Sequence, residues 1–211
     1  MMLKDNMKNG LLYVEHGHDN QDDLQYEQLL ETQRKLCKER IYDYNLLRPS
    51  DMTSKYALLK ELLGSCGEKI YLEAPIHFAY GCNTYIGENF YANFNLTIVD
   101  DIEVYIGNHV MMGPNVTLSV TGHPLDFHYR NDGTQFSLPI RIGNNVWLGA
   151  NVVVLPGVSI GDNSVIGAGS VVTKDIPDNV LAYGLPCKVI RKISDYDKEY
   201  FRKDKKVNFD W

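Results

Sequence analysis

Residues 142–176 read, in groups of six, IGNNVW LGANVV VLPGVS IGDNSV IGAGSV VTKDI. Every group opens with an aliphatic residue, and these residues are Ile142, Leu148, Val154, Ile160, Ile166 and Val172. Glycine follows four of them, and the residue four positions further on is mostly small or β-branched. A six-residue period is too short for a pair of helices or a propeller blade. It indicates a parallel β-helix, in which three groups close a coil of about eighteen residues.

Each position of the repeat has an expected role. The aliphatic residue points into the prism, the glycine supplies the backbone geometry of a corner, and the residue four positions on fits a narrow interior. Upstream, the period recurs in two runs separated by a two-residue slip; they are Tyr80, Ile86, Ala92 and Ile98, then Ile106, Met112 and Leu118. An ordinary sheet protein with glycine turns is the alternative, and six in-phase aliphatic residues favour the β-helix.

Helical spacing dominates the chain before the repeat. Apolar residues recur at helical intervals from about Asp19 to Asn45. A second helix is expected from Asp51 to Leu63, with Ser50 or Asp51 as its cap and Gly64 at its end. We therefore divide the chain into a helical segment over 1–66, a β-helix domain over 67–187 and a C-terminal tail over 188–211.

The repeat fails between about Val120 and Pro139, where the residues are polar and aromatic. A solenoid accommodates an insertion as a loop that leaves one of its corners. We expect an extended loop over about 121–139, with His123 at the point where the coil ends. Loops held by a rigid scaffold often carry function.

Composition narrows the classes of partner. The chain has 211 residues and a net charge of −6, which argues against a nucleic-acid partner. No segment has the apolar length of a membrane span, and the first residues lack a signal-peptide pattern, so a cytoplasmic protein without a membrane partner is expected. The four cysteines form no CxxC pair and are expected to be reduced thiols.

Five longer motifs carry a family resemblance. They are NFYANFNLTIVDD (89–101), NVTLSVTGHP (115–124), IGNNVW (142–147), IGAGSVVTKDI (166–176) and GLPCKVIR (184–191). In these motifs the chain resembles the bacterial galactoside and maltose O-acetyltransferases of the hexapeptide-repeat superfamily. The resemblance implies a mainly β fold, a left-handed parallel β-helix with an N-terminal helical segment. It also implies a homotrimer with active sites between subunits, and transfer of an acetyl group from acetyl-CoA to a hydroxyl of a small sugar.

The resemblance assigns the chemistry to His123, which matches the family's catalytic histidine. A sugar hydroxyl is a poor nucleophile at neutral pH, so a base must take its proton during attack, and histidine suits that role. The tetrahedral oxyanion needs a preorganised N–H donor. That donor is expected to be a backbone amide at Gly149 or Ala150.

The same resemblance places an acceptor site and a cofactor site. The residues that match acceptor positions are Asn93, Asp101, Tyr91, Arg34, Glu15 and Ala79. Glu15 replaces the usual aspartate, Ala79 replaces a serine that often contacts the sugar, and the segment 16–28 is longer, so galactoside specificity is not assumed. The residues that match acetyl-CoA positions are Trp147, Gly149, Ala150, Ala168, Thr173, Lys174, Lys188 and Arg191.

Three alternatives stay open at this point. A γ-class carbonic anhydrase would use zinc, and His123 and His128 have a suitable spacing, but three histidines are needed and His77 and His109 are not at evident partner positions. No metal is therefore expected. An acetyltransferase with a xenobiotic or serine-type acceptor would use the same scaffold. A purely structural solenoid would need neither the His123 loop nor the basic pair Lys188 and Arg191.

Overall fold

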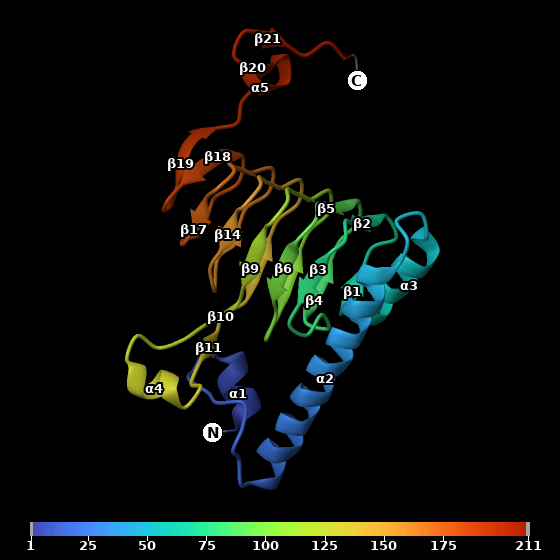
Figure 1. The fold of residues 1–211 in the computed structure, drawn as a ribbon. Coiled ribbons are helices and arrows are strands. Elements are labelled where there is room, and N and C mark those ends of the chain that lie inside the picture. The colour runs from blue at the N-terminus through green and yellow to red at the C-terminus, as the bar shows by residue number, and fades with distance from the viewer. Residues whose placement is uncertain (1, 210–211) are drawn as a thin grey trace.

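Three helices precede a rod of short strands in the computed structural model, which describes residues 2–209 (Figure 1). The helices are α1 (Leu3–Lys8), α2 (Gln21–Leu46) and α3 (Met52–Leu62). The sequence expectation for α2 and α3 is confirmed, and the Asp51 side chain caps α3 by accepting from the Ser54 amide at 3.1 Å. In the part of the chain that the structure describes, no helix has both the length and the apolar character to span a membrane.

The strands form three parallel sheets, which we call the first, second and third faces of a prism. The first face contains β1 (Ser65–Cys66), β4 (Thr84–Ile86), β7 (Val104–Ile106), β12 (Ile140–Ile142) and β15 (Ser159–Ile160). The second contains β2 (Ile70–Leu72), β5 (Phe90–Ala92), β8 (Met111–Met112), β13 (Trp147–Leu148), β16 (Val165–Ile166), β18 (Val180–Gly184) and the antiparallel β19 (Cys187–Lys192). The third contains β3 (Ile76–Phe78), β6 (Leu96–Val99), β9 (Thr117–Ser119), β14 (Val153–Val154) and β17 (Val171–Val172).

The interior of the prism follows the hexapeptide rule. All six leading aliphatic residues from Ile142 to Val172 are buried, and so is each residue four positions on, from Val146 to Ile176. Alternation within each strand sends one side chain inward and the next outward, which gives the repeat its period. The predicted parallel β-helix is therefore confirmed.

The coil length differs from the expectation in the first half of the rod. Arg141 pairs with Ser159, 18 residues on, but Ser65 pairs with Tyr85 and Tyr85 with Tyr105, 20 residues on. The slip seen in the sequence is thus a longer corner in each early coil. Tyr80, counted above as a repeat position, lies in such a corner, and Phe78 is the residue in register with Ile98.

The longer corner always joins the third face to the next first face, and we call this line of corners the third edge. It contains residues 79–83, 100–103 and the loop 120–139. The loop carries β10 (Thr121–Gly122), α4 (Phe127–Asn131) and β11 (Phe136–Ser137). Corners between the second and third faces form the second edge, at residues 93–95, 113–116, 149–152 and 167–170.

The predicted role of the repeat glycines is wrong in its mechanism. The left-handed corner residues are mostly asparagines, such as Asn89 (φ 55°) and Asn145 (φ 55°), and not the glycines that follow the aliphatic residues. Those glycines are needed because the coils stack closely. A Cβ on Gly107 would lie 2.8 Å from the carbonyl carbon of Gly143 in the next coil.

Both ends of the rod carry additional elements (Figure 1). Helix α2 packs against β3 near the first coils, and the buried Tyr44 hydroxyl donates to the Leu72 carbonyl at 2.6 Å. The tail beyond β19 forms α5 (Tyr196–Glu199), β20 (Tyr200–Arg202) and β21 (Lys205–Lys206). The four cysteines are free, as expected.

Candidate active site

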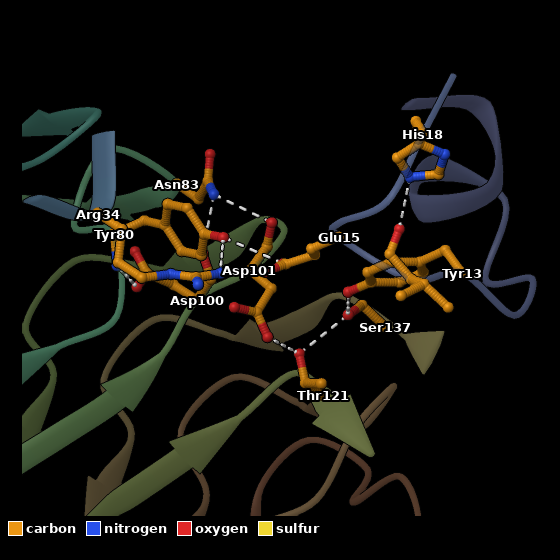
Figure 2. Close-up of polar contacts among 11 residues, drawn as sticks. Tyr13, Glu15, His18, Arg34, Tyr80, Asn83, Asp100, Asp101, Thr121 and Ser137 are labelled. Carbon is orange, nitrogen blue, oxygen red and sulfur yellow. Dashed lines mark hydrogen bonds and ion pairs between the residues drawn. The ribbon is translucent and has the colours of Figure 1, made fainter. Parts of the chain in front are cut away.

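The third edge gathers polar side chains from segments far apart in the sequence. Its longer corners place Tyr80 and Asp101 on successive coils, and the loop that leaves the third coil carries His123 directly after β10. The segment before α2 and the middle of α2 add Glu15 and Arg34 (Figure 2). These groups surround the foot of the loop.

His123 follows β10 and is exposed in the isolated chain. Its Nδ1 atom lies 2.8 Å from the carbonyl oxygen of Thr134, across the base of the loop. A carbonyl oxygen only accepts, so Nδ1 is the donor in this contact, and in a neutral ring the hydrogen would sit on Nδ1. The loop therefore holds the imidazole through its Nδ1 side.

Two neighbouring aspartates of the third edge have different environments. Asp100 is fully buried and accepts from the Tyr80 amide and the Thr84 hydroxyl, each at 2.9 Å. Burial raises its pKa to about 6. Asp101 is 9% exposed and accepts from the Thr121 hydroxyl. Burial raises the pKa of Asp101, and the hydrogen bond from Thr121 opposes that rise.

Glu15, Arg34 and Tyr80 form a closed triangle (Figure 2). Arg34 pairs with the Glu15 carboxylate and donates to the Tyr80 hydroxyl, which in turn donates to Glu15 Oε1 at 3.0 Å. Burial raises the pKa of Tyr80, so the phenol remains a neutral donor. Because Glu15 is longer than an aspartate, it reaches this pair from the N-terminal segment.

The other predicted acceptor residues do not all lie at this edge. Ala79 does, beside Tyr80, and its amide donates to the Ile98 carbonyl at 3.0 Å. Asn93 lies on the second edge, separated from Asp101 by the strand β6, and Tyr91 stacks on Tyr71 on the second face. One chain therefore does not bring Asn93 and Asp101 together.

Most of the predicted cofactor residues form a strip along the second edge and second face, whereas Thr173 and Lys174 follow a strand of the third face and lie outside this strip. Gly149, Ala150 and Ala168 are corner residues of this edge, and Trp147 projects from β13 with 50% of its surface exposed. Thr173 and Lys174 are exposed just after β17. The strip continues toward the C-terminal end of the rod.

The basic pair on β19 is only partly available. Lys188 is exposed, whereas both terminal nitrogens of Arg191 donate to Asp197, at 2.8 and 2.6 Å. Asp197 belongs to α5, so the tail holds the guanidinium of Arg191. One member of the predicted basic pair is therefore engaged by an acidic side chain of the same protein.

The amide of Ala150, on the second edge, is not used by the hydrogen bonds of the fold in the described part of the chain. Within residues 2–209 its N–H has no hydrogen-bond acceptor, while Gly149 donates to the Ile166 carbonyl at 2.8 Å. The equivalent corner of the preceding coil holds Pro114, next to Gly113. Because proline has no N–H, the fold does not use this amide for its own hydrogen bonds.

Sequence reasoning missed four residues near the site, which are Tyr80, Thr121 and Ser137 of the third edge and Tyr13 of the N-terminal segment. The Tyr13 hydroxyl bonds to Ser137 across 124 positions of sequence. No local sequence pattern predicts a contact between residues so far apart. Tyr80 and Thr121 are adjacent or close in sequence to predicted site residues, but only the longer corner explains why their side chains point toward the site.

The chain was compared with proteins of known family. Residues 6–67 match the maltose acetyltransferase hexapeptide capping motif, and residues 139–174 match the bacterial transferase hexapeptide (six repeats) model. The galactoside O-acetyltransferase of Escherichia coli K12 is 58% identical over 170 residues, covering 81% of this chain and 84% of that relative. The Lactococcus lactis enzyme of the same name is 47% identical over 184 residues, covering 84% and 89%.

Solved structures agree with the sequence comparisons. A galactoside acetyltransferase in complex with coenzyme A superposes with a TM-score of 0.92 at 49% identity, covering 99% of this chain and all of that one. A maltose O-acetyltransferase from Clostridium difficile 630 superposes with a TM-score of 0.84 at 40% identity, covering 92% and 98%. The fold class expected from the sequence is confirmed.

The β-helix, its capping helices and the histidine loop together define an acyltransferase built on hexapeptide repeats. More narrowly, the chain belongs to the galactoside and maltose O-acetyltransferase family. Throughout residues 2–209, no group of three or more histidine, cysteine, aspartate or glutamate side chains is arranged to hold a metal ion.

Proposed function

We propose that this protein transfers an acetyl group from acetyl-CoA to a hydroxyl of a small sugar, with His123 as the general base. The single observation that carries this proposal is the 2.8 Å contact between His123 Nδ1 and the Thr134 carbonyl, which in the neutral ring puts the hydrogen on Nδ1 and lets Nε2 accept a proton. Relatives named for galactoside and maltose acetylation, and a related structure named for its complex with coenzyme A, support both substrates.

The acceptor is held at the third edge. Asp101 and the Glu15–Arg34–Tyr80 triangle offer carboxylate acceptors beside guanidinium and phenol donors. A sugar hydroxyl both donates and accepts, so a mixed set of this kind suits a neutral polyhydroxyl compound. Nε2 of His123 accepts the proton of the attacking hydroxyl, and the hydroxyl oxygen forms its new bond to the acetyl carbonyl carbon.

The oxyanion that develops is stabilised from the second edge by the Ala150 amide. Trp147, Ala168 and Lys188 continue the same strip and line the cofactor, with Arg191 joining them at the nucleotide end, while Thr173 and Lys174 approach it from the third edge. Tyr91 and Asn93 approach the acceptor from this edge as well.

This division of the site supports the homotrimer that the family resemblance implies. His123 and Asp101 lie on the third edge, whereas Ala150 and Asn93 lie on the second edge of the same prism. A single chain does not bring the two halves together, but a ring of three places the third edge of one subunit beside the second edge of its neighbour. The active site is then formed between subunits.

A turnover assay with acetyl-CoA and a series of galactosides, glucosides, maltose and amino alcohols tests the proposal. We expect sugar hydroxyls to be acetylated and His123→Ala to lose at least about a hundredfold in kcat, the usual contribution of a general base. The variant should still bind acetyl-CoA in a titration, because His123 does not hold the cofactor. Near-normal turnover in His123→Ala contradicts the base role, and preference for an amino alcohol identifies the xenobiotic or serine-type alternative.

A second variant tests the oxyanion donor. Ala150→Pro removes one N–H and little else, and the corner already accommodates Pro114 one coil earlier. We expect a loss of about 10²–10³ in kcat with folding retained.

A further inference from the structure

Three hydroxyl groups connect the N-terminal segment to the carboxylate of Asp101. The Tyr13 hydroxyl lies 2.6 Å from Ser137 Oγ, Ser137 Oγ lies 2.9 Å from Thr121 Oγ1, and Thr121 Oγ1 bonds to Asp101 Oδ2. Figure 2 shows these groups linked one after another, ending at the carboxylate. This series of hydrogen bonds connects Tyr13, the strands β10 and β11 at the base of the loop, and the third edge.

The carboxylate at one end of this series of hydrogen bonds determines which group donates and which accepts in each of them. An ionised carboxylate only accepts, so Thr121 must donate to Asp101. The Thr121 oxygen then accepts from Ser137, and the Ser137 oxygen accepts from Tyr13. Hydrogen bonds aligned head to tail strengthen one another, especially where water is excluded. Tyr13 is 4% exposed and Ser137 is fully buried, so the far end of the chain is dry.

The alignment leaves the two oxygens of Asp101 unequal. Oδ2 accepts the hydrogen bond from the Thr121 hydroxyl, whereas Oδ1 has no hydrogen-bond partner within residues 2–209. His123 follows β10, and the Thr121 of that strand bonds to Asp101, so the carboxylate lies beside the strand that leads to the proposed base. Oδ1 is thus the oxygen available to an acceptor hydroxyl.

We propose that Thr121, Ser137 and Tyr13 are positioning residues that hold the Asp101 carboxylate in one orientation, with Oδ1 toward the acceptor. This inference rests on the proposed function, because it assigns Asp101 to acceptor binding. The three hydroxyls touch neither substrate. They act through Asp101, and their influence falls with distance along the chain from Thr121 to Tyr13.

The pH dependence of acceptor binding separates this role from a purely structural one. Burial raises the pKa of Asp101, as does the charge of Glu15 from the N-terminal segment, while Thr121, Arg34 of α2 and His123 of the loop lower it. Loss of the Thr121 hydroxyl therefore raises that pKa further. Protonated Asp101 accepts poorly, so acceptor binding is then lost at a higher pH than in the wild type.

The experiment compares Thr121→Val with Thr121→Ser in steady-state kinetics from pH 5 to 8. For Thr121→Val we expect the KM of the sugar acceptor to rise about tenfold or more, as for loss of a hydrogen bond to a charged group. The KM of acetyl-CoA should be unchanged, and the acidic limb of kcat/KM should move to higher pH. Thr121→Ser keeps the hydroxyl and should restore both values. Ser137→Ala and Tyr13→Phe should give the same pattern with decreasing size.

Each other outcome overturns the inference. An unchanged acceptor KM and acidic limb in folded Thr121→Val excludes the positioning role. So does a loss that tracks thermal stability alone, or one that Thr121→Ser fails to restore. If Thr121→Val does not fold, Ser137→Ala and Tyr13→Phe provide the same two measurements. Failure of the proposed function is separate, because it appears as absent sugar turnover in the wild type.

Discussion

Asp100 and Asp101 are adjacent, yet the third edge gives their carboxylates opposite tasks. Asp100 faces inward, where the Tyr80 amide and the Thr84 hydroxyl close the corner around it. Asp101 faces the loop, with one oxygen bound to Thr121. Asp100 directly follows β6 and continues the inward alternation of Leu96 and Ile98, whereas Asp101 lies in the bend after it. One aspartate therefore shapes the corner, and the other is the one proposed to bind the acceptor.

The raised pKa of Asp100 predicts a pH dependence of stability. Its pKa is about 6 in the folded protein, above the ordinary 3.8, so the folded state binds a proton that the unfolded state releases between those values. Stability from this group is fully present below about pH 4 and is lost as the pH rises to 6. Relative to Asp100→Asn, we expect the wild type to lose up to about 3 kcal/mol of unfolding free energy between pH 4 and 7.

Urea denaturation of both proteins across that pH range measures the difference. Asp126→Asn is the matched control, because the backbone amide of His128 lowers the pKa of that exposed carboxyl and its dependence has the opposite sign. A difference between wild type and Asp100→Asn that stays constant with pH contradicts the prediction.

The corners of the coil divide two requirements between neighbouring residues. The glycine after the aliphatic residue allows neighbouring coils to stack closely, and the residue two positions later adopts the left-handed backbone conformation. Gly107 and His109 (φ 56°) are an example. Asparagines at the later position also bond between coils, as Asn145 does with Asn163 at 2.9 Å. His109 stands where the neighbouring coils have asparagine.

Substitutions at this corner should distinguish the two requirements. Gly107→Ala should destabilise the protein by about 1–3 kcal/mol, because the new Cβ meets the backbone of Gly143 at 2.8 Å. His109→Gly at the same corner should be neutral or stabilising, since glycine adopts positive φ freely. Urea denaturation of the two variants checks both. The reverse order of stabilities would restore the interpretation in which the repeat glycine supplies the corner geometry.

At the scale of the whole molecule, the rod separates the two halves of the proposed site, so the proposed catalysis requires assembly. His123 and Asp101 lie on the third edge, and the Ala150 amide lies on the second. Because a rigid prism does not bend one edge toward another, we expect the two halves to meet between copies of the chain. Stability and activity are then linked through association.

Mixed trimers test this arrangement. His123→Ala and Ala150→Pro are each expected to be nearly inactive alone, but in randomly mixed trimers about one interface in four contains both intact halves. We expect co-refolded mixtures to recover activity in that proportion, measured as acetyl-CoA turnover per subunit. Physical mixing without subunit exchange is the control. No recovery after verified exchange would place both groups in one subunit.

Much of the fold was predictable because its determinants are local. The aliphatic positions from Ile142 to Val172, the cap at Asp51 and the loop after Val120 follow from short-range spacing, and each prediction was confirmed. The coil length before Val120 was not predicted, because a two-residue slip shows that the coil is longer but does not show which corner contains the added residues. The role of the repeat glycine was misjudged for a similar reason, since its neighbour lies one coil away.

By itself the sequence determined the prism, because its six-residue period places every leading aliphatic side chain inside the coil. It also marked His123 and the strip from Trp147 to Lys188, because family motifs are continuous stretches. Only the tertiary structure decided which edge each group occupies, that Asp197 holds Arg191, and that Tyr13 reaches Asp101 through two hydroxyls. The physical reason is distance along the chain: a hydrogen bond across 124 residues depends on how coils and helices pack, and no local spacing encodes it.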